Sequence, residues 1–388
     1  GDAGNAVANI TAPREFSSVS DIVSAFVQAT FNVRDDFRLT LGGRYTYEKK
    51  TGSRSLDFAD LNGNSLPIGE VDTVSAISFA AERHDLKGSR SEQHFSPLLN
   101  AQWEYSPEAM AYFTATRGFK AGGFDARSNQ SPSAALTPAN PGAVGPNRTS
   151  LVGTFEYDEE MATSFELGSK SSWLGGAAEF NVALFYTIYE DLQISIFDGT
   201  LGFNVGNAKE AITKGIEVDF RYQATEYLSF GGALALLDFE FTDFKNGQCR
   251  QGQAPTSADG QYCDYTGQSN QYVADWSGTF VIGYLRPISP TMGLGLSLDV
   301  VFSDDYNPSS NVDPRVEQSG FTKFNGRIGI GAIDQRWEVS LVGKNLTDEA
   351  LIVYAADTPL SHTIFGATTF TGFVEAPRSV ALQMSYRW

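Results

Sequence analysis

The sequence predicts an all-β protein, a transmembrane antiparallel β-barrel of the outer-membrane type. Three observations support this prediction. Apolar and polar residues alternate with period two in many segments, short and long connections alternate between those segments, and the final segment ends on an aromatic residue. Alternation indicates strands because successive side chains of a strand point to opposite faces of the sheet. A β-sandwich is the alternative, but its strands are shorter and its connections rarely show two alternating length classes.

Composition agrees with this fold class. The chain has 388 residues, 41% of them hydrophobic and 13% aromatic, with 38 glycines, as expected for many turns and for aromatic rows at a membrane interface. No stretch reaches the roughly 18 consecutive apolar residues of a membrane-spanning helix, which excludes a helical membrane protein. The net charge of −18 and the lack of a basic run argue against a nucleic-acid partner.

Alternation is clearest at residues 37–47, where Phe37, Leu39 and Leu41 are interleaved with Arg38 and Thr40. About thirteen segments qualify as strands, each near the roughly 9–11 residues that a tilted membrane strand needs. They are 23–33, 37–47, 95–105, 110–118, 163–170, 180–188, 216–222, 228–241, 276–284, 294–302, 321–332, 337–345 and 378–388.

The connections form two classes. Short ones follow residues 33, 105, 222 and 333. Long ones, rich in Gly, Pro, Asn, Ser and Asp, cover 49–92, 119–158, 244–272, 307–319 and 353–372, with 197–205 a shorter member. Outer-membrane barrels have short periplasmic turns and longer external loops.

The last strand carries its apolar residues at every second position: Val380, Leu382, Met384, Tyr386 and Trp388. This pattern is similar to the C-terminal strand that the outer-membrane assembly machinery recognises, although an ordinary closing strand would also alternate. If Trp388 lies at the periplasmic end, the first strand runs inward from outside. Single-chain bacterial barrels begin at the periplasm with an even strand count, and open edges in lipid are costly. We therefore expect further strands before residue 1.

Six segments, in this order, resemble the barrel of TonB-dependent receptors: ATRGFKAGGFDAR (115–127), FELGSKSSW (165–173), ALFYTIYEDLQI (183–194), NAKEAITKGIEVDF (207–220), LVGKNLTDE (341–349) and EAPRSVALQMSYRW (375–388). The resemblance implies that residues 1–388 form part of a barrel of about 22 strands. It also implies that the plug domain, the TonB-contact segment and the early strands lie outside this chain.

The resemblance further implies energised import across the bacterial outer membrane. The expected partners are membrane lipid, the TonB complex acting through the plug segment, the assembly machinery and a scarce small ligand. Ferric siderophores are the commonest ligand class, with vitamin B12, haem, nickel chelates and oligosaccharides as others. A passive porin or diffusion channel is the main alternative, and a barrel-borne adhesin or enzyme is a third.

Catalytic and metal-binding motifs are not found. His84, His94 and His362 lack metal-ligand spacing, and we expect His84 and His94 to be solvated in or beside an external loop. The Phe-Arg-Ala-Pro and Asn-Pro-Asn-Leu motifs of haem receptors are missing, as are a phosphate loop and a nucleophile elbow. We therefore expect neither an enzyme nor a resident cofactor or metal.

Charged residues within the alternating strands are assigned to the barrel interior, because Arg or Lys facing lipid costs about 2–4 kcal/mol at the bilayer midplane. In the family, such residues line the lumen and hydrogen-bond the plug, which is a structural role. They are Arg38, Arg44, Glu166, Lys170, Glu217, Asp219, Arg221 and Arg327.

Aromatic residues and arginines in two long loops are the candidate ligand contacts, because they suit a flat anionic chelate such as a ferric catecholate. Ordinary loop packing is the alternative role. The candidates are Phe119, Phe124, Arg127, Arg148 and Phe155 in one loop, and Arg250, Tyr262 and Tyr265 in the other.

Cys249 and Cys263 are the only cysteines and lie in a polar, Gly-rich stretch. They predict a small disulfide loop in an oxidising compartment, with two unrelated thiols as the alternative. A disulfide closing this loop would restrict it by roughly 3 kcal/mol.

Overall fold

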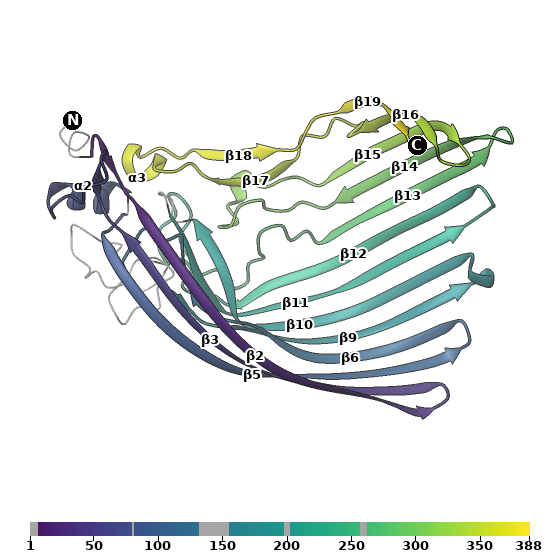
Figure 1. Cartoon of the computed structure of the whole chain (residues 1–388), viewed down its shortest axis with the longest axis horizontal. Coiled ribbons are helices and arrows are strands. Elements are labelled where there is room, and N and C mark those ends of the chain that lie inside the picture. The colour runs from purple at the N-terminus through teal and green to yellow at the C-terminus, as the bar shows by residue number, and fades with distance from the viewer. Residues whose placement is uncertain (1–6, 80, 132–154, 198–201, 257–261) are drawn as a thin grey trace.

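The structure is a computed structural model that describes residues 7–79, 81–131, 155–197, 202–256 and 262–388. Its main element is one curved antiparallel sheet of thirteen strands, in which each strand pairs with its neighbours in the chain (Figure 1). The strands are β2 (Arg14–Arg34), β3 (Phe37–Leu56), β5 (His84–Ser106), β6 (Ala109–Lys120), β9 (Glu160–Trp173), β10 (Ala178–Phe197), β11 (Phe203–Gln223), β12 (Leu228–Asp243), β13 (Trp276–Pro287), β14 (Met292–Ser303), β15 (Phe321–Ala332), β16 (Trp337–Lys344) and β19 (Ser379–Tyr386).

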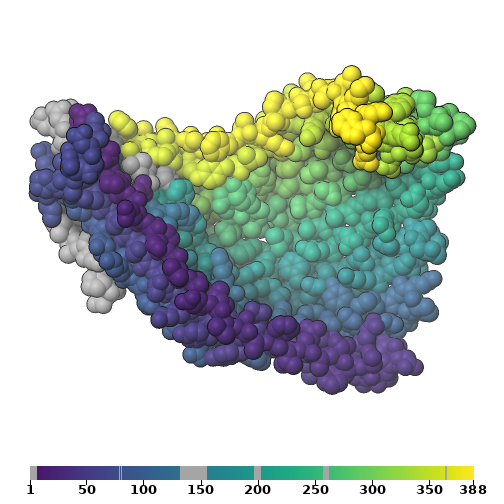
Figure 2. Space-filling model, viewed as in Figure 1, coloured from purple at the N-terminus to yellow at the C-terminus, as the bar shows by residue number. Residues whose placement is uncertain are grey.

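Thirteen strands at the predicted places confirm the all-β antiparallel fold class. The sheet is open, with β2 and β19 at its two edges. Figure 2 shows it as a hollowed trough. Within the described part of the chain β2 does not pair with β19, so this chain does not by itself display a closed barrel.

The two classes of connection lie at opposite ends of the sheet, as predicted. Short connections at 35–36, 107–108, 174–177, 224–227, 288–291 and 333–336 define the turn end. Longer ones at 57–83, 121–159, 198–202, 244–275, 304–320 and 345–378 define the loop end, at the left of Figure 1. Because the strands are antiparallel and connected in order, β2 and β19 both run from the loop end to the turn end.

The long connections contain their own small elements, which the sequence did not reveal. Two two-stranded sheets form within single connections: β7 (Gly123–Phe124) with β8 (Glu156–Tyr157), and β17 (Ile352–Asp357) with β18 (Phe370–Val374). In a third, β4 (Ala59–Asp60) of the connection after β3 pairs with β1 (Ile10–Thr11), which precedes β2. The helices are α2 (Glu70–Phe79), α3 (Ser361–Phe365) and the 3-10 turn η2 (Pro314–Val316), while η1 (Leu174–Gly176) lies in a short turn. Among the described helices, none has the length and apolarity to cross a membrane.

The register places all eight charged residues predicted to face inward on one face of the sheet. Directly paired residues share a face, so the face can be followed from strand to strand. One such path runs through Arg38–Gln102, Gln102–Tyr112, Tyr112–Gly168, Gly168–Ala183, Ala183–Glu217, Glu217–Ala235, Ala235–Ser277, Ser277–Ser303 and Ser303–Phe321, and continues through Arg327–Val342 and Val342–Ala381. We call this the polar face and the opposite one the apolar face. Val380, Leu382, Met384 and Tyr386 lie on the apolar face.

Aromatic side chains form two rows on the apolar face. The row near the turn end contains Trp103, Tyr105, Trp173, Tyr222, Tyr284, Trp337 and Tyr386, and the other contains Tyr45, Tyr47, Phe95, Tyr186, Trp276 and Phe302. Along β13, the eight residue-to-residue steps from Trp276 to Tyr284 span about 27 Å of strand. After strand tilt this approaches the roughly 25 Å apolar band of outer-membrane barrels, which aromatic girdles flank on both sides.

Several strands extend further toward the loop end than predicted. β3 continues to Leu56 and β5 begins at His84, so the connection predicted at 49–92 is reduced to 57–83. The prediction that His84 and His94 are solvated loop residues is therefore wrong. Both lie in β5, His84 is buried, and the side chain of His94 is only 9% exposed. Phe119 likewise belongs to strand β6 rather than to a loop.

Candidate ligand-binding end

The loop end of the sheet is covered by two packed clusters. One contains Leu56, Phe58, Val71 and Ala81 and lies above β3. The other is built on Ile194, Ala208, Ala211, Phe241, Phe244, Cys263 and Tyr265, above β10 to β12. The loops therefore have hydrophobic cores of their own, and these cores fix the polar residues around them.

Arg54 lies at the loop end of β3, beyond the aromatic rows, and is fully buried. Its Nη1 and Nη2 donate to the carbonyl oxygens of Asp125 and Gln130 at 2.8 and 2.9 Å. Its Nε donates to His84 Nε2 at 3.2 Å, so the proton of His84 is on Nδ1, which lies 2.8 Å from the Glu82 carbonyl oxygen. Burial and the nearby Arg54 charge lower the pKa of His84 to about 4. His84 is therefore neutral at physiological pH.

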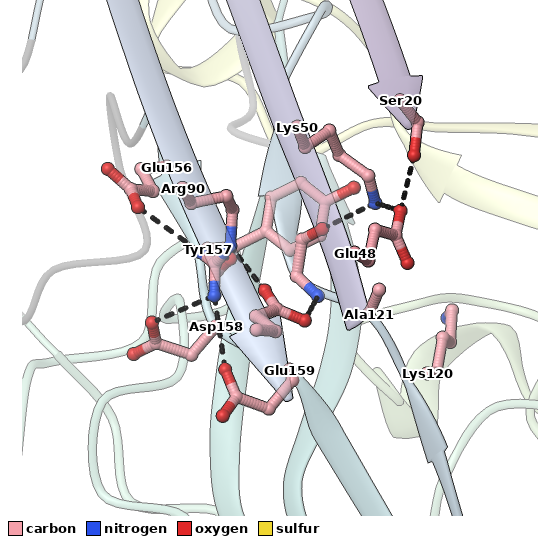
Figure 3. A network of polar contacts seen from close by, with 12 residues as sticks. Ser20, Glu48, Lys50, Arg90, Lys120, Ala121, Glu156, Tyr157, Asp158 and Glu159 are labelled. Atoms are coloured by element: carbon pink, nitrogen blue, oxygen red, sulfur yellow. Dashed lines mark hydrogen bonds and ion pairs between the residues drawn. The ribbon is translucent and has the colours of Figure 1, made fainter. Parts of the chain in front are cut away.

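A second polar cluster surrounds Arg90 of β5, whose side chain is 9% exposed (Figure 3). Its Nη1 donates to the Tyr157 carbonyl oxygen at 2.5 Å, and its Nε donates to Glu92. Three further carboxylates approach it from the segment before β9: Glu156 at 3.3 Å, Glu159 at 3.1 Å and Asp158 at 3.7 Å. One guanidinium is thus shared by four carboxylates.

Lys50 of β3 extends this cluster toward β2. Its Nζ donates to the Gly122 carbonyl oxygen at 2.7 Å and forms an ion pair with Glu48 at 3.0 Å. Glu48 also accepts a hydrogen bond from Ser20 at 2.6 Å, and Glu92 accepts one from the Gly122 amide at 3.3 Å. Figure 3 shows these contacts joining three strands to the connection between β6 and β9.

Most of the predicted ligand contacts are packed inside the loops. Phe124 and Phe155 are buried with ring centroids 4.9 Å apart. Phe124 lies directly over Gly52 and Gly88, where a Cβ atom would overlap its ring. In the other cluster, Tyr262 is buried, and buried Tyr265 donates to the Gln248 carbonyl oxygen at 2.7 Å. These four side chains have the loop-packing role in this structure.

The remaining candidates differ from one another. Arg250 donates to the Asn311 carbonyl oxygen at 2.9 Å and is held within the loops. Phe119 stacks on His94 with ring centroids 4.0 Å apart. Arg127 is exposed, with its guanidinium carbon 5.5 Å from the centre of the Phe203 ring. Arg148 lies outside the described residues.

Arg127 lines an open pocket of about 370 Å³ together with Arg14, Glu15, Phe16, Ala126 and Phe203. The pocket lies where the loop end of β2 meets the connection after β6 and the start of β11. Arg14 donates to the Asn129 side chain. Two guanidinium groups and two phenyl rings therefore meet at one site. Of this set, only Arg127 is predictable from the sequence, because Arg14 and Phe203 are distant in sequence and lie outside the two candidate loops.

The predicted inward-facing residues have partners on the polar face. Arg221 pairs with Glu179 at 2.6 Å, Arg327 pairs with Glu338 at 2.6 Å, and Tyr112 donates to Glu166 at 2.5 Å. Asn181 donates to Asp219 at 2.9 Å. These are cross-strand contacts that stabilise the sheet, and the contact of this face with a lumen stays a prediction.

Cys249 and Cys263 form a disulfide in the connection between β12 and β13. The adjacent Gln251 then joins this connection to two others. Its Nε2 donates to Ser361 Oγ at 2.7 Å, and its backbone oxygen accepts from Arg315 at 2.8 Å. The disulfide-closed loop therefore lies at the centre of three connected loops.

Asp357 lies in β17, in the connection between β16 and β19, and leads to a prediction about how the stability of these loops depends on pH. Burial and the neighbouring Asp313 carboxylate raise the pKa of Asp357. The Asp357 carboxylate therefore binds a proton more readily in the folded protein than in the unfolded chain. Protonation of Asp357 stabilises the folded loops fully at pH values below the ordinary Asp pKa of about 3.9. This stabilisation is lost as the pH rises through the raised pKa of Asp357 in the folded protein.

We expect Asp357→Asn to raise the melting temperature at pH 7.5 and to have a smaller effect near pH 4, because the amide resembles the protonated acid. Thermal unfolding at both pH values measures this, with Asp334→Asn in the exposed turn before β16 as the control. A lower melting temperature of the variant at pH 7.5 would show that the Asp357 carboxylate stabilises the cluster.

Within the described residues, no set of three or more His, Cys, Asp or Glu side chains is arranged to hold a metal ion. The loop end offers cations, aromatic faces and hydrogen-bond donors instead. The two-faced sheet and its aromatic rows define the fold class as an antiparallel β-barrel sheet of the outer-membrane type.

The chain belongs to the TonB-dependent receptor-like β-barrel family, whose model matches residues 1–346. The prediction from the six sequence segments is thus confirmed. The fold is similar to the ferric yersiniabactin uptake receptor FyuA of Yersinia pestis (TM-score 0.67, 15% identity, 96% of this chain and 46% of that chain). It is also similar to the siderophore receptor PiuA of Acinetobacter baumannii (TM-score 0.63, 16% identity, 96% of this chain and 44% of that chain).

A third similar structure is the closed form of the ferric-catecholate import receptor Fiu of Escherichia coli K12 (TM-score 0.60, 15% identity, 95% of this chain and 45% of that chain). The chain thus spans less than half the length of these three solved structures. At such identities the likeness establishes the shared fold alone.

Proposed function

We propose that this chain is part of an outer-membrane receptor that imports a scarce small ligand by TonB-dependent transport, with ferric siderophores as the ligand class. The apolar face contacts membrane lipid, the polar face lines the interior, and the alternating residues of β19 serve as the assembly signal. TonB acts through a plug domain, as the family resemblance implies. Family membership supports this class of function, and the three similar structures are by name a ferric yersiniabactin uptake receptor, a siderophore receptor and a ferric-catecholate import receptor.

The observation that carries the ligand class is the pocket of Arg14, Phe16, Arg127 and Phe203. Its volume of about 370 Å³ lies within the roughly 300–1,000 Å³ of small-molecule sites. A ferric catecholate is anionic and has flat aromatic rings. Guanidinium groups donate in pairs to anionic oxygens, and they stack on aromatic faces. The pocket therefore offers both interactions that such a chelate needs.

Arg127→Ala and Arg14→Ala are each expected to weaken binding of the iron(III) tris-catecholate complex by about tenfold, since each removes a charge-assisted contact of about 1.4 kcal/mol. Quenching of intrinsic tryptophan fluorescence in detergent measures the affinity. Arg336→Ala is the matched control, because it removes an arginine that is also exposed but lies at the turn end. Unchanged affinity in both pocket variants would exclude this pocket as the site.

A passive porin remains the second candidate, because the strands and faces would be the same. Uptake by living cells separates the two functions. We expect accumulation of iron from the tris-catecholate complex to stop when the proton gradient is collapsed with an uncoupler. Passive diffusion through a pore would continue under the same conditions.

A further inference from the structure

We infer that Arg90 is a positioning residue that holds the two described ends of the β6–β9 connection (residues 121–131 and 155–159), and with them Arg127, in the arrangement that binds ligand. This inference deepens the proposed function and rests on it. Arg90 lies on the polar face of β5 and lines no part of the Arg127 pocket. It therefore acts through the connection and not by touching the ligand.

Both ends of the connection meet at Arg90. At the far end, Arg90 contacts Glu156, Tyr157 and Glu159 just before β9. At the near end, it packs so closely on Gly122 that a Cβ atom there would overlap its guanidinium group. The Gly122 backbone is also bonded to Glu92, which is itself paired with Arg90. One side chain thus fixes the two ends of the connection to the same strand.

The electrostatics make this contact strong and specific. Arg90 faces the carboxylates of Glu92, Glu156, Asp158 and Glu159, while the neighbouring Lys50 is paired with Glu48. The side chains of Arg90 and Glu92 are only 9% and 7% exposed, so solvent screens this pair weakly, whereas the carboxylates of Glu156, Asp158 and Glu159 are more exposed and more strongly screened. Removing the guanidinium leaves four like charges close together, which pushes the far end of the connection away from β5. Lysine keeps the charge but cannot contact several carboxylates in a fixed planar geometry.

The position of Gly122 is transmitted to the pocket through a short, bonded segment. Gly123–Phe124 forms β7 and pairs with β8, which contains two of the Arg90 contacts. Asp125 then accepts from the Arg127 amide at 2.7 Å and from the Val205 amide at 2.7 Å. Arg127 and the Phe203–Val205 segment are therefore fixed relative to each other. A shift at Gly122 is expected to move both sides of the pocket.

The experiment uses the receptor in detergent with two readouts, affinity for iron(III) tris-catecholate and the mobility of a nitroxide label at Ala126→Cys. Arg90→Gln is expected to weaken binding at least about tenfold and to increase label mobility. Arg90→Lys should fall between Arg90→Gln and the wild type. Arg221→Gln is the matched control, because it breaks a polar-face ion pair of 2.6 Å near the turn end, and it should match the wild type in both readouts.

Gly122→Ala tests the same contact with all charges retained, and it is expected to weaken binding and increase label mobility as Arg90→Gln does. It replaces Arg90→Gln in the experiment if that variant fails to fold. If Arg90→Gln leaves both the affinity and the label mobility unchanged, Arg90 does not have the proposed role, while the proposed ligand class still stands. The same conclusion follows from unchanged values in Gly122→Ala if Arg90→Gln does not fold. If the wild type does not bind the complex but the label is still released in Arg90→Gln, the ligand class is wrong and the positioning role of Arg90 stands.

Discussion

Leu234→Arg is expected to remove most of the protein from the outer membrane. Leu234 lies on the apolar face of β12, between Phe230, which pairs with Tyr222 of one aromatic row, and Leu236, which pairs with Trp276 of the other. It is 39% exposed, as a lipid-facing side chain should be. Arginine at this depth costs about 2–4 kcal/mol, a large part of the stability of a typical domain.

Ala235→Arg is the matched control for this prediction. Ala235 is the next residue of the same strand but lies on the polar face, directly opposite Glu217. The same arginine there gains an oppositely charged neighbour, and we expect normal protein levels. Immunodetection in isolated outer membranes and the loss of heat-resistant migration on gels measure the two variants. Equal loss in both would mean that our assignment of the two faces to lipid and interior is incorrect.

The sequence predicted the strands well where one face is apolar. In β12, Leu234 and Leu236 alternate with Ala233 and Ala235, and the structure has a strand there. Alternation is a local property, because each position depends only on which face of its own strand it occupies. The assignment of residues to the two faces followed from it without any long-range information.

The predicted strand boundaries were wrong where strands extend beyond the aromatic rows. Residues 48–55 read EKKTGSRS and residues 84–93 read HDLKGSRSEQ, with polar side chains on both faces. Such segments have no periodicity and resemble loops. They are strands because they pair with each other over their whole length, from Glu48–Glu92 to Leu56–His84. Arg54, His84 and Arg90 all lie in these segments, so their burial was not predictable.

The residues of the candidate ligand site were likewise only partly predictable from the sequence. Arg127 was identified because it lies in a long loop beside aromatic residues. Its pocket partners Arg14 and Phe203 are contributed by the starts of β2 and β11. Only the packed loops bring these three segments together, and no local pattern encodes such a contact. The sequence indicated arginine and aromatic residues in the long loops, and the structure shows which of them share one pocket.

Replacing both Cys249 and Cys263 by serine is expected to destabilise the cluster above β10 to β12, which contains Cys263, by about 3 kcal/mol. The two cysteines are 14 positions apart, and a closed loop of about 15 residues is worth roughly that amount in the chain-entropy model. Cys263 is fully buried among Phe241, Phe244 and Tyr265, so a serine hydroxyl there also loses apolar contacts. Because Gln251 joins this loop to Ser361 and Arg315, the connections after β14 and β16 should loosen with it.

Limited proteolysis of the receptor in detergent measures this effect, with cleavage expected first within residues 244–275 and then within 345–378. The sheet itself should remain intact, because its cross-strand hydrogen bonds do not depend on the loops. Adding a reductant to the wild type should reproduce the cleavage pattern of the double variant, and it should not change the variant further. Cleavage confined to residues 244–275 would show that the three loops are independent and that the Gln251 contacts contribute little. Resistance equal to the wild type would show that packing around Tyr265 alone holds the loop.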